Sequence, residues 1–227
     1  MSDETEEQKK LMRQIDISCV QAFHTMDEID AMVELAKKYR LAAVFTLPAF
    51  SAHVAERLQD TREIHAGGVV SFPGGGDTTG QKKRQAKELW EAGCREIDMV
   101  MNLTAFRSHE FSYVKEELLA IREQVPSAIF KVIIEAPQLT EQEICQAVDL
   151  CVKGRADYVK TSTGWYPGCP STVEQVRIMS REAGRIQIKA AGGIRSLETI
   201  QEMQKAGCSR FGMGMRSVQN LIKSIYK

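Results

Sequence analysis

Two lysines lie at the ends of short β-branched runs, where a purely structural strand would carry apolar residues. Lys160 follows Tyr158-Val159, and Lys189 follows Gln187-Ile188. A lysine amine attacks a carbonyl carbon only when it is unprotonated, and an ordinary lysine is protonated at neutral pH. A second ammonium group nearby lowers the pKa of the first, and an apolar site lowers it further. The pair predicts Schiff-base chemistry, in which a protonated imine makes the neighbouring carbon acidic and permits an aldol reaction.

Four other charged residues fall within short β-branched runs, namely Asp16, Asp98, Lys131 and Glu135. An unpaired charge is costly to bury, so Asp98 and Lys131 are interpreted together with the two lysines as a functional set. Asp98 is the best-placed carboxylate for proton transfer. Asp16 or Glu135, taken alone, fits better a strand-end residue that faces outward or one half of a structural ion pair.

The chain alternates short β-branched runs with longer charged segments of helical spacing. The expected strands are Ile15–Cys19, Leu41–Leu47, Gly68–Phe72, Glu96–Met101, Phe130–Glu135, Ala156–Thr161, Ile186–Ala190 and Ser209–Gly212. The expected helices are Asp27–Tyr39, Gln81–Ala92, Tyr113–Gln124, Glu141–Lys153, Thr172–Ala183 and Leu197–Ala206.

This alternation indicates an α/β protein with a parallel sheet, and eight such units close a (β/α)8 TIM barrel in about this length. A doubly wound open sheet is the alternative that periodicity leaves open. We expect a flexible polar leader over residues 1–10 and a single catalytic barrel domain over residues 11–227. In the barrel, the two lysines lie on consecutive strands and could face each other across the lumen.

Glycine-rich segments follow the two last expected strands. The first is Ala190–Arg195 and the second is Gly212–Arg216, while Thr163-Gly164 follows the strand before them. Glycines let backbone N–H groups approach an anion, and the loops after strands seven and eight of a barrel are its usual phosphate site. The candidate phosphate-site residues are Gly164, Gly192, Gly193, Arg195, Gly212 and Gly214.

Composition excludes several classes of protein. The 227 residues include 30 Lys plus Arg and 30 Asp plus Glu, so the formal net charge is zero, which argues against a nucleic-acid partner. There is no apolar run long enough to cross a bilayer and no secretory signal. The six cysteines are scattered, without metal-ligand spacing. We expect a cytoplasmic protein with no metal, no membrane partner and no nucleic-acid partner.

Four motifs together resemble the deoxyribose-phosphate aldolase family: Glu96–Asn102, Phe130–Glu135, Val159–Gly164 and Ile188–Arg195. They occur in the order of the family and span nearly the whole chain. The resemblance implies a (β/α)8 barrel and a class I aldolase that needs no cofactor beyond its own lysine. The implied reaction is the reversible cleavage of 2-deoxy-D-ribose 5-phosphate to acetaldehyde and D-glyceraldehyde 3-phosphate.

The resemblance also implies roles for individual residues. Lys160 becomes the Schiff-base nucleophile, Lys189 the lysine that tunes it, Asp98 the proton-transfer carboxylate and Lys131 its ordering partner. Asp16 matches an early-strand aspartate of the family and is placed with the substrate-binding residues. The phosphate would be surrounded by Gly164, Gly192, Gly193, Arg195, Gly212 and Gly214. Relatives are often dimers, so a homodimer is possible.

The chain departs from the family around the expected pocket. Hydroxyl residues usual after the eighth strand are replaced by Met213 and Met215, and Arg216 is the candidate substitute for their phosphate contacts. The second strand, where the family often has Cys near the aldehyde, reads Val44-Phe45-Thr46-Leu47-Pro48. Trp165 follows the signature glycine. Further departures are the glycine-rich loop Phe72–Asp77 and Gln85, where the family usually has Glu.

These changes keep two alternatives open. One is a class I aldolase for another phosphorylated sugar or keto substrate. The other, less favoured, is a non-catalytic phosphosugar-binding protein. The four histidines, including His24, are expected at the surface, and Tyr226 is expected to pack on the barrel rather than to enter the active site.

Overall fold

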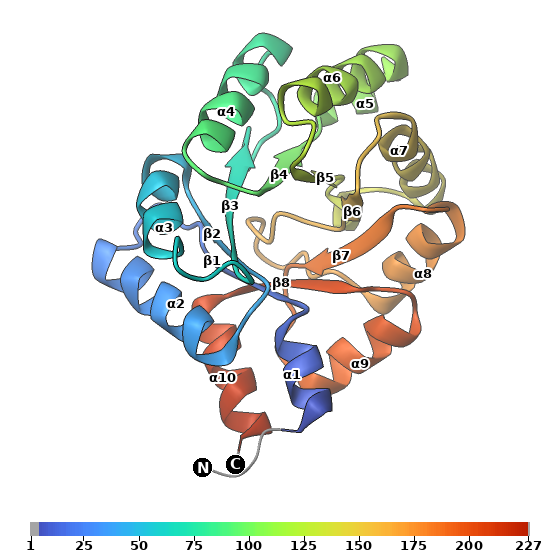
Figure 1. Cartoon of the computed structure of the whole chain (residues 1–227). Coiled ribbons are helices and arrows are strands. Elements are labelled where there is room, and N and C mark those ends of the chain that lie inside the picture. The colour runs from blue at the N-terminus through green and yellow to red at the C-terminus, as the bar shows by residue number, and fades with distance from the viewer. Residues whose placement is uncertain (1–4, 227) are drawn as a thin grey trace.

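The computed structural model describes residues 5–226. Within this range, parallel strands close a barrel in the order β1-β2-β3-β4-β5-β6-β7-β8, and the helices surround it (Figure 1). The strands are β1 Ile15–Cys19, β2 Ala43–Thr46, β3 His65–Val70, β4 Glu96–Val100, β5 Ile129–Ile133, β6 Tyr158–Lys160, β7 Gln187–Ala191 and β8 Arg210–Gly214. The predicted (β/α)8 barrel is confirmed, and the open sheet is excluded because β1 pairs with β8.

The helices include several that the sequence pattern did not indicate. Their bounds are α1 Glu6–Met12, α2 Met26–Tyr39, α3 Ser51–Arg57, α4 Thr79–Glu91, α5 Leu103–Arg107, α6 Phe111–Gln124, α7 Glu141–Lys153, α8 Val173–Glu182, α9 Leu197–Lys205 and α10 Met215–Ile225. Two 3-10 turns, Pro48–Phe50 and Ala136–Gln138, follow β2 and β5. The unexpected α3 and α5 are short, so they hold too few turns for an apolar stripe to be recognised.

The expected flexible leader over residues 1–10 is wrong in its second half. A helix, α1, starts at Glu6, and the Thr5 side chain accepts a hydrogen bond from the Gln8 backbone N–H while the Gln8 side chain accepts one from Thr5. This capping box satisfies backbone N–H groups of Thr5 and Gln8 and so stabilises a helix where the charged composition had suggested a flexible segment. The first part of the predicted leader, residues 1–4, lies outside the described residues.

Side chains alternate between the two faces of each strand. In β4, Glu96 and Asp98 are buried inside the barrel, while Ile97 and Met99 belong to the apolar core between the strands and the helices. The barrel therefore has a polar interior and an apolar outer layer. This division explains how charged residues can lie within runs that otherwise read as buried strands.

Tyr226, the last described residue, lies on the side of the barrel where the strands begin. The Tyr226 ring lies 5.3 Å from the ring of Tyr39 at the end of α2. Because α2 runs antiparallel to the strands, its last residue lies at their N-terminal end, away from the loops that follow the strands. Tyr226 thus packs on the barrel, as expected. No helix in the described part of the chain is long and apolar enough to cross a membrane.

A buried ion pair fixes β4 from outside the barrel. The Lys82 Nζ of α4 lies 2.9 Å from Glu117 Oε2 of α6 and donates to the Val100 carbonyl at 3.0 Å. The same Glu117 oxygen accepts from the Asn102 backbone N–H at 3.2 Å. Both side chains are fully buried. The pair holds the end of the strand that carries Asp98.

We predict that Lys82→Met lowers the free energy of unfolding by about 3–5 kcal/mol, because it leaves the Glu117 carboxylate buried without its counter-charge. Urea unfolding followed by circular dichroism measures this difference. The control is Lys87→Met, which removes an ion pair to Glu91 whose side chains are 60% and 61% exposed. The control should change stability by less than about 0.5 kcal/mol. Equal losses in both variants would contradict the structural role of Lys82.

Candidate active site

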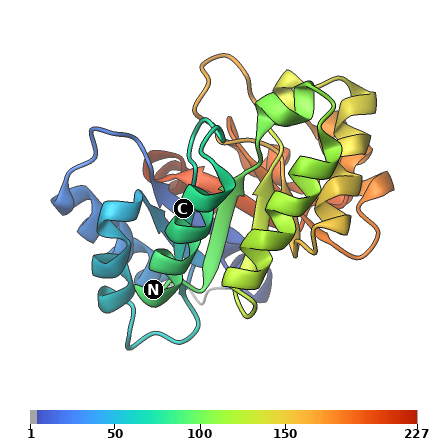
Figure 2. The ribbon, with the colours of Figure 1, turned by 90° about the horizontal axis from the view of Figure 1, so that it is seen from above.

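A pocket of about 200 Å³ opens at the end of the barrel where the strands stop. The segment after β6 projects beyond the barrel in the turned view of Figure 2. The pocket combines both lysines with loop residues that follow β1, β6, β7 and β8. Its lining includes Asp16, Lys160 and Lys189 and every candidate phosphate-site residue, that is Gly164, Gly192, Gly193, Arg195, Gly212 and Gly214.

One carboxylate oxygen binds both lysines. Lys160 Nζ donates to Asp98 Oδ2 at 2.8 Å, and Lys189 Nζ donates to the same oxygen at 2.6 Å. The other oxygen, Oδ1, accepts from Lys131 Nζ at 3.0 Å. Asp98, Lys131 and Lys189 are almost completely buried, whereas Lys160 is 7% exposed. The four residues predicted as a functional set are therefore in direct contact.

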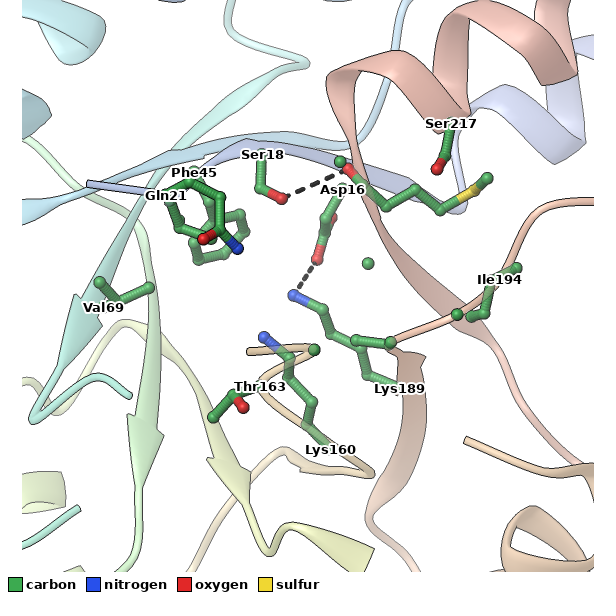
Figure 3. A pocket seen from close by; sticks show the side chains of 18 of the residues that line it. Asp16, Ser18, Gln21, Phe45, Val69, Lys160, Thr163, Lys189, Ile194 and Ser217 are labelled. Carbon is green, nitrogen blue, oxygen red and sulfur yellow. Dashed lines mark hydrogen bonds and ion pairs between the residues drawn. The ribbon is translucent and has the colours of Figure 1, made fainter. Parts of the chain in front are cut away.

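From the sequence, the two lysines could have faced each other across the lumen. The structure shows a different arrangement. β6 and β7 are neighbouring strands, and Lys160 and Lys189 are register partners, so the side chains lie side by side. Figure 3 shows both reaching toward the same part of the pocket. This arrangement brings the ammonium groups together on Asp98 more closely than opposite positions would.

Asp16 is a partner of the second lysine. Its Oδ2 lies 2.6 Å from Lys189 Nζ, and its Oδ1 accepts from Arg210 Nε at 2.6 Å. The carboxylate is 1% exposed. Asp16 thus lies at the base of the pocket as one member of a buried ionic network. The expectation that it faces outward is wrong, and the alternative expectation of an ion pair is confirmed.

Glu96 and Arg210 complete this network. Neither residue had a role predicted from the sequence. Arg210 donates from Nη2 to Glu96 Oε1 at 2.7 Å, and Lys131 Nζ donates to Glu96 Oε2. His65 Nδ1 lies 2.9 Å from Glu96 Oε1. Glu96 stands two residues before Asp98, so strand alternation alone would have placed it on the same interior face.

We call these residues the barrel ion cluster: Asp16, Glu96, Asp98, Lys131, Lys160, Lys189 and Arg210. Among the described residues, the cluster has four basic and three acidic side chains, which leaves one positive charge in excess if all are ionised. An uncompensated buried charge is costly. Loss of one lysine proton removes the excess.

The pKa shifts follow this arrangement. Burial would raise the pKa of Asp98, but the three lysines around it hold the pKa well below its usual value, so the carboxylate stays ionised. Burial lowers the pKa of Lys189 to about 8; Lys160 and Lys131 act in the same direction, while Asp16 and Asp98 oppose them. The cluster can therefore release a proton near neutral pH.

Glu135 holds the segment after Lys160. It is buried, with a positive φ of 53°, and accepts hydrogen bonds from Ser162 Oγ at 2.5 Å and Thr163 Oγ1 at 2.6 Å. The Thr163 backbone N–H donates to it at 3.2 Å. Glu135 neither faces outward nor forms an ion pair, so both interpretations that we had considered for it are wrong. It positions the loop that leads from the lysine to Gly164.

The glycine segments form one side of the pocket. Gly164 and Gly192 both have positive φ, and a Cβ on Gly164 would lie 3.2 Å from Gly192 Cα, so the two backbones approach too closely for side chains. Ser217, in the first turn of α10, also lines the pocket. It supplies a hydroxyl that we had judged to be missing after β8.

Arg216 does not take the predicted place of the missing hydroxyls. It is exposed and lines a neighbouring surface pocket instead of the one that contains the lysines. As the second residue of α10, it projects about 100° around the helix from Ser217. His24 also differs from expectation: it lines the active-site pocket, and its side chain is 27% exposed. The described residues contain no cluster of three or more His, Cys, Asp or Glu that could hold a metal ion.

Comparison with known proteins gives the same family from sequence and structure. The sequence profile described as DeoC/LacD family aldolase matches residues 2–222. A deoxyribose-phosphate aldolase from Klebsiella pneumoniae is 38% identical over 219 residues, covering 95% of this chain and 88% of the relative. The chain belongs to the DeoC/LacD aldolase family. The resemblance noted in the sequence is thereby confirmed.

Further relatives of this aldolase family agree. A deoxyribose-phosphate aldolase from Aquifex aeolicus is 39% identical over 199 residues, covering 87% of this chain and 89% of the relative. The solved structure of QR15, an aldolase, superposes with a TM-score of 0.88 at 34% identity and covers 100% of this chain and 97% of its own. A tetrameric deoxyribose phosphate aldolase from Aeropyrum pernix has a TM-score of 0.87 at 25% identity, with coverage of 96% and 92%.

Several apolar side chains lie on one side of the pocket. Val20, Phe45, Val69 and Phe72 line it there, and the Trp165 ring meets the Phe72 ring edge-on at 5.8 Å. In Figure 3, Phe45 and Val69 lie opposite Ile194 and Ser217, with the lysines between them. The pocket therefore has an apolar half and a half rich in backbone N–H groups.

The loop after β3 is ordered by the residue that replaces the usual Glu. Gln85 accepts a hydrogen bond from the Ser71 backbone N–H at 2.8 Å and donates one to Asp77 at 2.9 Å. A glutamate could accept the first bond but could not donate the second to a carboxylate. The Gln85 side chain thus suits the Asp77 of this chain.

We predict that Glu96→Gln shifts the pH at which the lysine pair loses its first proton to a lower value. The substitution removes a negative charge from a cluster that already has a positive excess, so the ammonium forms become less favourable. The pH dependence of lysine modification by an aldehyde and borohydride measures the shift, with folding checked by circular dichroism. Glu91→Gln is the exposed control. An unchanged pH dependence in Glu96→Gln would show that Glu96 is electrostatically isolated from the lysines.

Proposed function

We propose that this protein is a class I aldolase that reversibly cleaves 2-deoxy-D-ribose 5-phosphate to acetaldehyde and D-glyceraldehyde 3-phosphate. The observation that carries the proposal is the contact of Lys160 and Lys189 with one oxygen of Asp98. This contact lies at the base of a pocket that can receive both an aldehyde and a phosphate. Family membership and the names of the relatives support the substrate.

The reaction begins when Lys160, as a neutral amine, attacks the aldehyde carbon of the open-chain sugar phosphate. Loss of water then leaves a protonated imine. Removal of the proton from the hydroxyl on the third carbon breaks the bond between the second and third carbons, and the electrons move into the imine. Glyceraldehyde 3-phosphate leaves. The enamine takes a proton on its terminal carbon, and water releases acetaldehyde and restores Lys160.

Asp98 and Lys189 are the groups that can move these protons. Asp98 accepts a hydrogen bond from Lys160 and stays ionised at neutral pH. Lys189 donates to the same oxygen of Asp98. Lys131, held by Glu96, fixes the other oxygen of Asp98 and so fixes its orientation. We therefore assign Lys160 as the nucleophile, Asp98 as the proton-transfer carboxylate, and Lys189 as the lysine that favours the neutral form of Lys160.

The phosphate would lie against the glycine segments. Gly192 and Gly193 follow β7, Gly214 precedes α10, and the backbone N–H groups at such positions bind anions. Arg195 lines the same side of the pocket and supplies a positive charge. Ser217 adds a hydroxyl donor. These residues support a phosphate site across the pocket from the apolar half.

A second candidate is a class I aldolase for another phosphorylated sugar or keto substrate. The apolar half of the pocket, with Phe45 and the Phe72–Trp165 ring contact, favours it. Cleavage rates for 2-deoxyribose 5-phosphate should be compared with those for ketose phosphates and deoxy-keto phosphates. Negligible cleavage of deoxyribose 5-phosphate, together with turnover of another sugar phosphate, would show that the lysine chemistry is retained but acts on a different substrate.

The family supports three further proposals. The reaction needs no metal and no cofactor beyond Lys160, the enzyme works in the cytoplasm, and it assembles as a homodimer. The tetrameric relative from Aeropyrum pernix makes a higher assembly the competing possibility. Light scattering of the purified protein distinguishes these states.

We predict that reduction by borohydride in the presence of acetaldehyde adds a two-carbon adduct to Lys160. Intact mass followed by peptide mapping detects it, and Lys160→Met should lose the adduct and all cleavage activity while remaining folded. Lys153→Met, which removes an exposed lysine, is the matched control. Ligand-dependent thermal stabilisation without any adduct would instead identify a non-catalytic phosphosugar-binding protein.

Arg195→Ala should raise KM for the phosphorylated substrate about ten- to a hundredfold, because a charge-assisted phosphate contact contributes about 1.5–3 kcal/mol. The rate for unphosphorylated 2-deoxyribose should change little. Steady-state kinetics with both sugars separates the two effects. Equal losses for the two substrates would remove the phosphate role of Arg195.

A further inference from the structure

Phe45 lies against the ammonium groups of two cluster lysines. It belongs to β2, is 3% exposed, and lines the pocket. Its ring centroid is 4.3 Å from Lys189 Nζ and 4.8 Å from Lys131 Nζ. An ammonium group at this distance is attracted by the negative face of an aromatic ring, and the attraction increases when water is excluded.

The neighbouring strand leaves room for this ring. Gly67 of β3 is the register partner of Phe45, and a Cβ at Gly67 would lie 2.3 Å from two carbons of the ring. Ala43 and Val69 pack with Phe45 in a small apolar cluster inside the barrel. The ring is thus held in one position, and the lysines meet a fixed aromatic face.

The charged groups that face Lys189 come from five strands. They are Asp16 from β1, Asp98 from β4, Lys131 from β5, Lys160 from β6, and Arg210 from β8, the last through Asp16. The Asp98 oxygen is shared between Lys160 and Lys189 and does not favour either. Among the described residues, Asp16 and the Phe45 ring contact the Lys189 ammonium group but not that of Lys160.

This asymmetry matters because the pair must lose one proton for the reaction. A neutral amine has no charge for the aromatic face to attract, so the ring stabilises every state in which Lys189 is protonated. Burial already brings the pKa of Lys189 down to about 8, close to the working pH. The ring opposes this effect of burial, because it stabilises the protonated form of Lys189 by about one pKa unit.

We propose that the Phe45 ring keeps the proton of the lysine pair on Lys189, so that Lys160 is the amine that becomes neutral and attacks the carbonyl carbon. Phe45 is then a positioning residue: it does not touch the reacting atoms and acts through the protonation state of Lys189. The inference rests on the proposed Schiff-base function and explains why Lys160, rather than Lys189, forms the imine.

The proposal predicts a particular pH dependence. In the doubly protonated pair, and in the pair with neutral Lys160, Lys189 carries its proton and the ring contact is equal. Removal of the ring therefore leaves imine formation on Lys160 unchanged at pH 6. Above pH 8, the form with neutral Lys189 gains population, and the rate on Lys160 falls by about three- to tenfold, as expected for loss of a desolvated cation–π contact.

Two replacements of Phe45 test this. Phe45→Leu keeps an apolar side chain without an aromatic face, and 3,5-difluorophenylalanine at position 45 keeps the ring shape while weakening its negative face. Each variant is treated with acetaldehyde and cyanoborohydride from pH 6 to pH 9. Peptide mapping then gives the rate of adduct formation on Lys160 and the share of adduct on Lys189. Phe106→Leu, which removes a buried aromatic ring of α5 that does not line the pocket, is the matched control.

We expect adduct on Lys160 alone in the unaltered protein and the control, and a pH-dependent loss with new adduct on Lys189 in both Phe45 variants. An equal loss at every pH without adduct on Lys189 would overturn the inference, because that is the effect of lost packing. Unchanged rates and sites would also overturn it. If Phe45→Leu does not fold, the fluorinated protein decides. Absence of any adduct in the unaltered protein would instead contradict the proposed function.

Discussion

The Asp98 carboxylate accepts hydrogen bonds from three lysines inside the barrel, and the other parts of the site are arranged around this contact. Lys160 and Lys189 share one of its oxygens, and Lys131 holds the other. Three ammonium groups keep Asp98 ionised, while their mutual repulsion and burial make one of them easy to deprotonate. A single buried anion thus provides both a proton acceptor and a reactive amine.

The fold supplies the conditions that this contact requires. Strand alternation directs charged side chains into the barrel and apolar ones toward the helices, so the ionic groups are shielded from water without interrupting the apolar core. Register pairing of Lys160 with Lys189 and of Asp98 with Lys131 places the four side chains at neighbouring depths. Glu135 then fixes the loop after Lys160, which joins the lysine pair to the glycine-rich half of the pocket.

Much of this arrangement could be predicted from the chain, because it depends on local pattern. The alternation of strands and helices indicated a parallel sheet, and the family resemblance implied that it closes into the barrel. Charged residues within apolar runs indicated Asp98, Lys131 and the two lysines. Contacts between distant strands were harder to predict. Arg210 contacts Asp16 across the closure between β8 and β1, which the sequence does not reveal before the barrel is known. The same holds for Phe45, whose position depends on Gly67.

The remaining differences between the sequence-based predictions and the structure lie in loops and at the ends of helices. Ser217 lines the pocket because α10 begins directly after Gly214, and this turns its third residue toward the glycine segments. Glu135 adopts a left-handed backbone conformation that few non-glycine residues take, so its inward orientation could not be inferred from strand periodicity. These residues are set by tertiary contacts rather than by propensity.

The most direct test of the account is an NMR titration of the lysine side-chain Nζ groups with selectively labelled protein. Single lysine-to-methionine substitutions at the four buried lysines of the described residues, Lys82, Lys131, Lys160 and Lys189, would assign their signals. The account predicts that Lys131 remains charged throughout the accessible range and that the Lys160–Lys189 pair loses its first proton well below the ordinary pKa of a lysine. Titration of Lys131, Lys160 and Lys189 all near the ordinary value of about 10.4 would contradict it, because the cluster would then hold its full positive charge at neutral pH.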